Sequence, residues 1–498
     1  MTHQKTLKYT AVATATSLLL ALSGCDSSID KPSSDQYSTG NADFSTLVTV
    51  GDSLTAGYAD SALYLNGQLA SYPAILAGQI SEVEPITFTQ PLVNDNTGGL
   101  LAGGTPIATV SNRLVLTAGA DGALGPAPIA GDPTTDIAVP VVGPFNNVGV
   151  PGAKSFHLVT PNYGDISALP NANPYFVRFA SAAGTTVLAD AVSQTPTFFT
   201  LWIGNNDTLS YATGGGVGVD QTGNLDPSTY GSSDITDPNV FASTYNSMVT
   251  ALTTAGAKGV LINLPDVTSI PFFTTVPYNA IPLDAETAAG VNAAFATYNG
   301  GLLQAETNGF ITADEVAART VVYAAGNNAV LISDEALTDL SGAGLPSIRQ
   351  ATADDFILLT TSSVLGTLAN PADATTVIGV SVPLSDDQVL TAAEVELTAT
   401  ANTSYNATIA AIADANPDLA LYDAAAAQRE LATTGVQYGT GGITATFATG
   451  GGFSLDGVHP TERGYAVIAN DIIGVIEESF GATIPRVDPS SYRTVYTN

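Results

Sequence analysis

The hydrophobic residues of the chain alternate between short continuous runs and longer segments in which they recur every three or four positions. The runs at 44–50, 197–203, 259–264 and 419–422 are short and mostly apolar. Such runs predict strands that are buried on both faces of a sheet. Because helical segments lie between them, the pattern predicts an α/β protein whose parallel sheet is covered by helices on both faces.

Four amphipathic helices are predicted from apolar spacings of three and four and from residues that suit helix ends. They cover 71–80, 237–256, a segment that ends at 416, and 465–480. The second begins with Asp237-Pro238, an N-capping residue followed by a residue that fits the first helical turn.

Three stretches do not follow this alternation. Residues 91–145, rich in Gly, Pro, Ala and Asn, predict an insertion, and residues 211–234 predict a long loop. Residues 277–383 contain strand-like runs at 321–323, 330–332 and 357–359, and they predict a second insertion between the core segments 44–276 and 384–498. Because the chain leaves and re-enters the core near the carboxyl ends of strands, we expect 277–383 to form a cap or pocket wall. The alternative is a satellite subdomain at the side.

The first residues have the layout of a secretory signal. Lys5 and Lys8 precede a short apolar stretch, which ends at Leu22-Ser-Gly-Cys25. This tetrapeptide resembles a bacterial lipobox, which implies removal of residues 1–24, lipidation of Cys25 and a flexible tether over 25–43. The alternative is an ordinary signal followed by an unrelated cysteine. Lipidation implies anchoring in a bacterial cell envelope, in the outer membrane rather than the inner, although Asp26 leaves the choice of membrane open.

Composition narrows the function classes. The chain has 498 residues, which suits about three units or one large domain with insertions. It has 13 Lys and Arg against 45 Asp and Glu, a formal charge of −32, which argues against nucleic acid as a partner. Cys25 is the only cysteine, which excludes an intramolecular disulfide and a multi-cysteine zinc site. The acidic surface suits a salty exterior or loosely bound cations.

Polar motifs follow the predicted strands. Gly-Asp-Ser-Leu stands at 51–54, Gly-Asn-Asn-Asp at 204–207, and Asn-Val-Gly-Val-Pro-Gly at 147–152, while Asp-Gly-Val-His at 456–459 precedes the last helix. Ligands of parallel sheets bind beyond the carboxyl ends of the strands. Each motif alone is a weak signal, since each also occurs in ordinary turns and loops.

Together and in this order, the motifs resemble those of the SGNH (GDSL) hydrolase superfamily, over about 45–275 and 390–485. The large GDSL-type lipolytic lipoproteins of bacteria are similar over most of the length. The resemblance implies a three-layer α/β/α fold with a parallel, flavodoxin-like sheet plus insertions. It implies Ser53 as nucleophile and Asp456 and His459 as its partners. It also implies an oxyanion hole formed by Ser53, Gly152 and Asn206.

The chemistry of these residue types agrees with that assignment. A serine hydroxyl needs an adjacent base, which His459 can supply, and Asp456 can orient the imidazole and stabilise its charged form. A tetrahedral oxyanion needs preorganised N–H donors. The Gly-x-Ser-x-Gly and His-Glu-x-x-His motifs are absent from the sequence. We therefore expect no cofactor and no catalytic metal.

The expected function is ester hydrolysis through an acyl-enzyme, on short- to medium-chain acyl esters or lipids. Carbohydrate O-acetylesterase activity is the first alternative, and a non-catalytic surface binding lipoprotein is the second. Phe272 and Phe273 either line an acyl pocket or pack under the insertion. Trp202 is expected in the core, and Asp52 is expected to make local hydrogen bonds.

Overall fold

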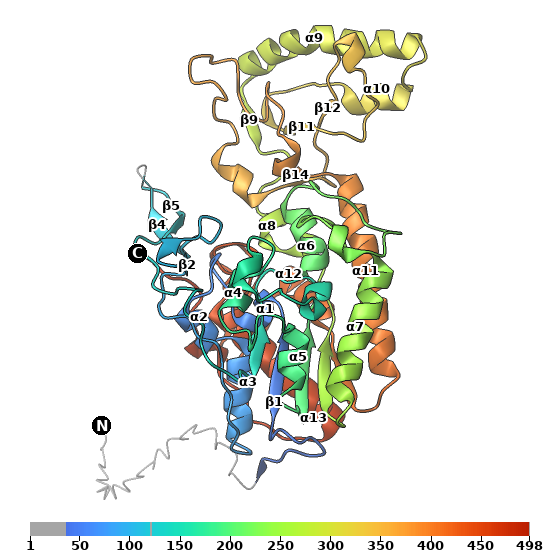
Figure 1. Ribbon diagram of the computed structural model, residues 1–498. Helices are drawn as coiled ribbons and strands as arrows, with labels where there is room; N and C mark the ends of the chain where they lie inside the picture. The colour runs from blue at the N-terminus through green and yellow to red at the C-terminus, as the bar shows by residue number, and fades with distance from the viewer. Residues whose placement is uncertain (1–35, 120–121, 498) are drawn as a thin grey trace, which may run out of the picture.

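The computed structural model describes residues 36–119 and 122–497 (Figure 1). The predicted signal segment 1–24, the lipidation residue Cys25 and the first part of the tether lie outside the described residues.

A central sheet of five parallel strands organises the protein. The strands are β1 (Leu47–Gly51), β6 (Asn147–Gly149), β7 (Phe198–Trp202), β8 (Lys258–Ile262) and β15 (Leu419–Tyr422), in the spatial order β15-β8-β7-β1-β6. Numbered along the chain, this is the doubly wound order 2-1-3-4-5. The predicted α/β class and parallel sheet are confirmed. Only β6 was not predicted as a strand, since three residues are too few to show a pattern.

Helices cover both faces of the sheet. On one face α3 (Tyr72–Ser81) packs against α13 (Glu462–Phe480). On the other face, α7 (Pro238–Thr253) packs against α11 (Ala392–Asp414) and α5 (Val187–Val192). The predicted cap of α7 is present, since the Asp237 carboxylate accepts from two backbone N–H groups of the first turn.

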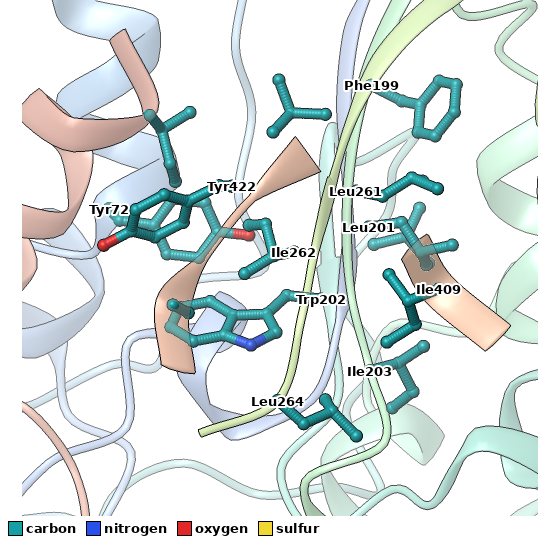
Figure 2. Packing of buried hydrophobic residues seen from close by; sticks show 14 of the residues in the cluster. Tyr72, Phe199, Leu201, Trp202, Ile203, Leu261, Ile262, Leu264, Ile409 and Tyr422 are labelled. Atoms are coloured by element: carbon teal, nitrogen blue, oxygen red, sulfur yellow. The ribbon is translucent and has the colours of Figure 1, made fainter. Parts of the chain in front are cut away.

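Alternate residues of the strands enter the two halves of the core. Figure 2 shows Trp202 with Tyr422 on one side of the sheet, and Leu201 with Leu261 on the other. Every residue of β7, and every residue of β8 except Lys258, is buried, and each fully buried large apolar side chain contributes about 1.5–3 kcal/mol. Burial on both faces explains why these strands are nearly continuous apolar runs.

The strand register aligns the carboxyl ends of three strands. Gly51 of β1 pairs with Gly149 of β6 and with Trp202 of β7. The loops that follow β1, β6 and β7 therefore start from one row at one edge of the sheet. That edge is where a doubly wound fold binds its ligands.

Shorter elements complete the core. Residues 91–145 form two antiparallel hairpins and connecting loops beside the sheet. The remaining core elements are α1 (Ser53–Ala56), α2 (Leu65–Leu69), β2 (Leu101–Ala102), β3 (Thr105–Pro106), β4 (Leu114–Ala118), β5 (Leu124–Pro128), α4 (Pro174–Val177), α6 (Asn206–Thr213), α8 (Pro271–Thr274), α12 (Ala424–Thr433), β16 (Val436–Tyr438) and β17 (Gly441–Ile443).

Residues 277–383, hereafter the lobe, have a hydrophobic cluster of their own. Figure 1 shows the lobe standing beyond α8, with its longest helix at the far end. Its elements, with the strand that closes it, are β9 (Ile281–Leu283), α9 (Ala285–Thr307), α10 (Ala313–Arg319), β10 (Gly326–Asn328), β11 (Leu331–Ser333), β12 (Ile348–Gln350), β13 (Phe356–Ile357) and β14 (Val389–Leu390).

The strand predictions in the lobe are only partly right. The run 330–332 overlaps β11 and the run 357–359 overlaps the end of β13, but 321–323 is irregular backbone, with Val321 and Tyr323 buried. The helix α9 was not predicted, because alanine and glycine occupy many of its positions and blur the apolar period. None of the helices in the described part of the chain combines the length and apolar composition that a membrane crossing requires.

Candidate active site

Ser53 lies at the turn between β1 and α1, where it is the first helical residue. Asp52 caps this helix, since its carboxylate accepts from Leu54 N at 3.0 Å and from Asn205 Nδ2 at 2.9 Å. Gly51 leaves no room for a side chain, because a Cβ there would stand 2.2 Å from Thr55 Oγ1. The turn is therefore held on both sides, and it presents the Ser53 hydroxyl at the carboxyl edge of the sheet.

His459 reaches Ser53 from the loop before α13. Its Nε2 lies 2.9 Å from Ser53 Oγ, and its Nδ1 lies 2.9 Å from Asp456 Oδ2. When Nδ1–H donates to the carboxylate, the lone pair of Nε2 is left to accept from the serine hydroxyl. The structure thus brings the three predicted catalytic residues together in one hydrogen-bonded chain.

Asp456 is held as a carboxylate. Burial acts to raise its pKa, but the neighbouring His459 and several hydrogen bonds outweigh burial and lower the pKa to about 2. The donors include the backbone N–H groups of His459, Val458 and Ser61, at 2.8 to 2.9 Å. Asp52 differs, since burial raises its pKa to about 6 against the hydrogen bonds from Asn205 and Leu54.

The loop after α1 supports the loop that carries Asp456 and His459, hereafter the histidine loop. This support was not predicted from the sequence. Ser61 donates to Asp456 through its backbone, and Asp60 accepts from Leu455 N at 3.0 Å and donates its own N–H to Ser454 Oγ at 2.9 Å. Both Asp60 and Ser61 have positive φ, at 53° and 63°. The only signal in the sequence is a polar pair after a short helix, which does not differ from a surface turn.

Asn206 lies beside the turn that contains Gly152, although it is 53 positions from Ala153 in the sequence. The Asn206 side chain donates through Nδ2 to Ala153 O at 2.9 Å, directly after Gly152. Gly152 has φ of 79°, and the only atom within 4 Å of an added Cβ would be Asn173 Nδ2 at 3.9 Å. No hydrogen bond within 36–119 or 122–497 uses the backbone N–H of Ser53 or Gly152. These donors remain available to a ligand.

The strand register explains why these residues meet. Ser53, Gly152 and Asn206 follow the aligned row of Gly51, Gly149 and Trp202 within four residues. Short loops from one row of a sheet cannot carry their side chains far apart.

The other described histidine has a different environment. His157 stacks on Tyr163, with ring centroids 4.6 Å apart, and its Nδ1 accepts from Lys154 N at 3.0 Å. Burial, with the charge of Lys154, lowers the pKa of His157 to about 4. It is therefore a neutral packing residue rather than a second base for Ser53.

A cavity of about 110 Å³ opens beside Ser53 and His459. Its far walls come from α12, α13 and the hairpin of β16 and β17, and Trp202 closes the side toward the sheet. Trp202 is thus both a core residue and part of the cavity wall, and it lies on the same side of the sheet as Tyr422 in Figure 2. Most of the wall is apolar, as in Trp202, Ile270, Leu431, Ile443, Phe453 and Val467.

Two expectations about the surroundings of Ser53 do not fit this cavity. Phe272 and Phe273 are buried in α8 and are not among its lining residues. Phe273 packs edge-on against Phe356 of the lobe, and the Phe272 backbone N–H donates to Gly457 O at 3.0 Å. Phe273 thus packs under the insertion and the Phe272 backbone supports the histidine loop, which fits the packing alternative and not the acyl-pocket alternative.

The lobe also contributes no wall to this cavity within the described residues. Leu359 of the lobe packs against Gly457, which lies between Asp456 and His459. The expected cap over Ser53 is thus not seen, because the lobe folds around its own hydrophobic cluster.

No protein-family model matches the chain, and no curated protein or solved structure is significantly similar to it. The chemistry of the site follows from its own residues and distances.

Proposed function

We propose that this protein is a serine ester hydrolase of the SGNH type, acting through an acyl-enzyme. The observation that carries the proposal is the chain of two 2.9 Å contacts from Ser53 Oγ through His459 to Asp456. Its place at the carboxyl edge of a doubly wound sheet, together with the Gly-Asp-Ser-Leu turn, supports the SGNH assignment.

In the first half-reaction, Ser53 Oγ attacks the ester carbonyl carbon while His459 Nε2 takes the hydroxyl proton. The charged imidazole is stabilised by Asp456, whose low pKa keeps it ionised. Collapse of the tetrahedral intermediate breaks the bond to the alcohol, which receives the proton from His459. A water molecule then repeats the sequence on the acyl-enzyme and releases the acid.

The developing oxyanion needs donors that are already in place. The N–H groups of Ser53 and Gly152 have no other acceptor in the described residues, and the Asn206 amide lies beside them. Such donors stabilise the transition state more than the ground state, and losing one typically reduces the rate by about 10²–10³.

The cavity supports acyl chains as the substrate group. It adjoins the nucleophile, and its mostly apolar wall gives sugar hydroxyls few partners. We therefore propose short- to medium-chain acyl esters or lipids as substrates, with acetylated carbohydrate as the alternative.

The predicted lipid anchor belongs to this proposal. An anchor at Cys25 would hold the hydrolase at a bacterial cell envelope, as its resemblance to a lipobox implies. Metabolic labelling with a radioactive fatty acid tests this directly. Label should enter the wild type and not Cys25→Ser, and equal labelling would reject the anchor.

The function is tested with p-nitrophenyl esters of increasing acyl length, run beside acetylated sugars. A fluorophosphonate probe should react once with the wild type, and mass spectrometry should locate the adduct on Ser53. Ser53→Ala should lose both the adduct and the turnover. His459→Ala should lose turnover, whereas its matched control His157→Ala should keep both. Activity on acetylated sugars alone would favour the alternative. If the wild type shows no turnover and no labelling, the remaining alternative is a non-catalytic binding protein.

A further inference from the structure

A group of three acidic side chains lies where the lobe joins the core. Glu335 follows β11 of the lobe, Asp386 begins a short 3₁₀ segment after it, and Glu394 lies in the first turn of α11. One carboxylate oxygen from each lies within 4.8 Å of the others. Oxygens bound to one Ca²⁺ at 2.3–2.6 Å stand at most about 5.2 Å apart, so this spacing fits a shared ion.

Glu394 provides an independent sign of a missing ligand. The residue is only 3% exposed. Its Oε2 accepts from Thr391 N at 2.6 Å and from Thr391 Oγ1 at 2.8 Å, while Oε1 has no hydrogen-bond partner among the described residues. A buried carboxylate oxygen without a partner is costly, and the free oxygen belongs to the carboxylate that faces Glu335 and Asp386.

The glycines after α6 pack so closely against the group that they leave no room for a side chain. Gly216 follows α6 with φ of 82°, and a Cβ there would stand 1.7 Å from Glu394 Oε1. A Cβ on Gly215 would stand 2.1 Å from Asp386 O. The end of α6, whose negative dipole end favours cations, is thus packed against the acids.

Within the described residues, none of the three acids forms a salt bridge with a basic side chain. Arg349 binds Asp334 at 2.5 Å and Asp355 at 2.6 Å. Three carboxylates at this spacing repel one another, and a bound cation would remove that repulsion.

We propose that Glu335, Asp386 and Glu394 bind one Ca²⁺, which fastens the lobe to the core. The donors are all oxygens, which select a hard cation. One comes from the lobe, one from the connection and one from a core helix, so the ion would add a further link beside the pairing of β13 with β14 and the hydrogen bond from Ala392 N to Asp355. Water and backbone carbonyls would supply the remaining ligands.

Calcium binding is measured by titrating the full chain, first treated with EDTA, with CaCl₂ in a calorimeter. We expect one site, whose affinity falls about tenfold or more in Glu335→Gln, since calcium affinity depends on the number of charged ligands. Glu335 is exposed, so this variant should fold. Glu396→Gln, an exposed residue two positions after Glu394 on the same helix, should bind as the wild type does.

Thermal unfolding separates an ion site from a purely structural acid group. Saturating Ca²⁺ should raise the Tm of the wild type by about 2 °C or more, and much less in Glu394→Gln. Without Ca²⁺, Glu394→Gln should melt no lower than the wild type, because glutamine can still cap α11 and no longer repels Asp386.

Absence of binding at millimolar CaCl₂, or equal binding by the wild type and Glu335→Gln, would overturn the proposal. Equal binding and stabilisation by MgCl₂ would overturn the choice of calcium, because Mg²⁺ needs oxygens at 2.0–2.1 Å and a smaller site. These measurements do not use ester turnover, so they are independent of the proposed hydrolase.

Discussion

The core and the lobe are built in different ways. The core has a central sheet in which β1 and β7 pair along their whole length. Both strands are fully buried, and most of their residues are apolar. The lobe has strands of only two or three residues, and it buries Arg319 completely. That guanidinium donates to Thr338 O at 2.8 Å and to Pro346 O at 2.7 Å. Side chains there satisfy backbone groups that strand pairing satisfies in the central sheet, as Arg178 does for Leu92 O at the start of the insertion 91–145.

This difference bears on where chemistry can be placed. Catalytic groups must be held to fractions of an ångström, and a regular sheet whose strand ends are in register provides that. The lobe contacts the surroundings of the site through Leu359, which packs on Gly457, and through Phe356, which packs on Phe273. We infer that the core alone carries catalysis, while the lobe affects stability and the position of the histidine loop.

The largest effect is expected for Ser53→Ala. Loss of the nucleophile should lower kcat by about 10⁴-fold or more, and His459→Ala should do the same, because the residues act as a unit. Steady-state kinetics with an acetate ester measure this. Melting temperatures close to the wild type would show that the fold is intact. If Ser53→Ala keeps activity near the wild-type level, Ser53 is not the nucleophile and the active site does not lie at this edge of the sheet.

Asn206→Ala should lower kcat by about 10²–10³, the usual loss for one oxyanion donor. Asn205→Ala is the matched control at the next position, since its amide binds Asp52 and does not face Gly152. The control should lose clearly less kcat than Asn206→Ala in the same assay. If the two variants lose equally, the loss comes from the loop rather than from oxyanion binding.

Acyl-chain preference should respond to the core wall and not to the lobe. Leu431→Trp would fill the cavity, so the octanoate-to-acetate ratio of kcat/KM should fall by about tenfold or more. Leu359→Ala, on the lobe side, should leave that ratio unchanged and lower the melting temperature.

Replacing 277–383 by a short Gly/Ser linker tests the same point more severely. A folded variant that keeps the parent's ranking of ester lengths agrees with the observed cavity. A changed ranking would show that the lobe does guide substrate, as a cap would.

The smallest effect is a pH dependence of stability that arises at the three acids joining the lobe to the core, hereafter the junction. The pKa of Glu394 is raised to about 7 from its usual 4.5, so the folded state binds more protons than the unfolded state between these values. Without Ca²⁺, this group therefore makes unfolding easier as pH rises from 4.5 to 7. The carboxylates of Glu335 and Asp386 lie beside Glu394, and after burial their charges contribute to its raised pKa.

Other groups also titrate in this window, so the difference between two proteins is the quantity to measure. The Tm of the wild type in EDTA, minus that of Glu394→Gln, should become more negative from pH 4.5 to pH 7.5. Saturating Ca²⁺ should abolish that trend. A flat difference in EDTA would mean that Glu394 does not carry the repulsion inferred for the junction.

Much of the core follows from local sequence. Strands β1, β7, β8 and β15 were predicted because burial on both faces leaves a continuous apolar run, and α7 was predicted because Asp237-Pro238 marks its start. Ser53, Gly152 and Asn206 were named together because their motifs resemble those of the SGNH superfamily, and of the three only Ser53 and Asn206 follow strands that the sequence itself predicted. In a parallel sheet, such positions converge whatever the loops contain.

What the tertiary structure decided are the contacts between segments far apart in the chain. Ser61 binds Asp456 across 395 positions, and the cavity joins Trp202 to α12, α13 and a small hairpin. Phe272 and Phe273 turned away from the cavity, and three acids at 335, 386 and 394 came together. None of these has a local signature, because a side chain's partners across the core depend on how whole elements pack, whereas a strand, a cap or a turn depends on its neighbours in sequence.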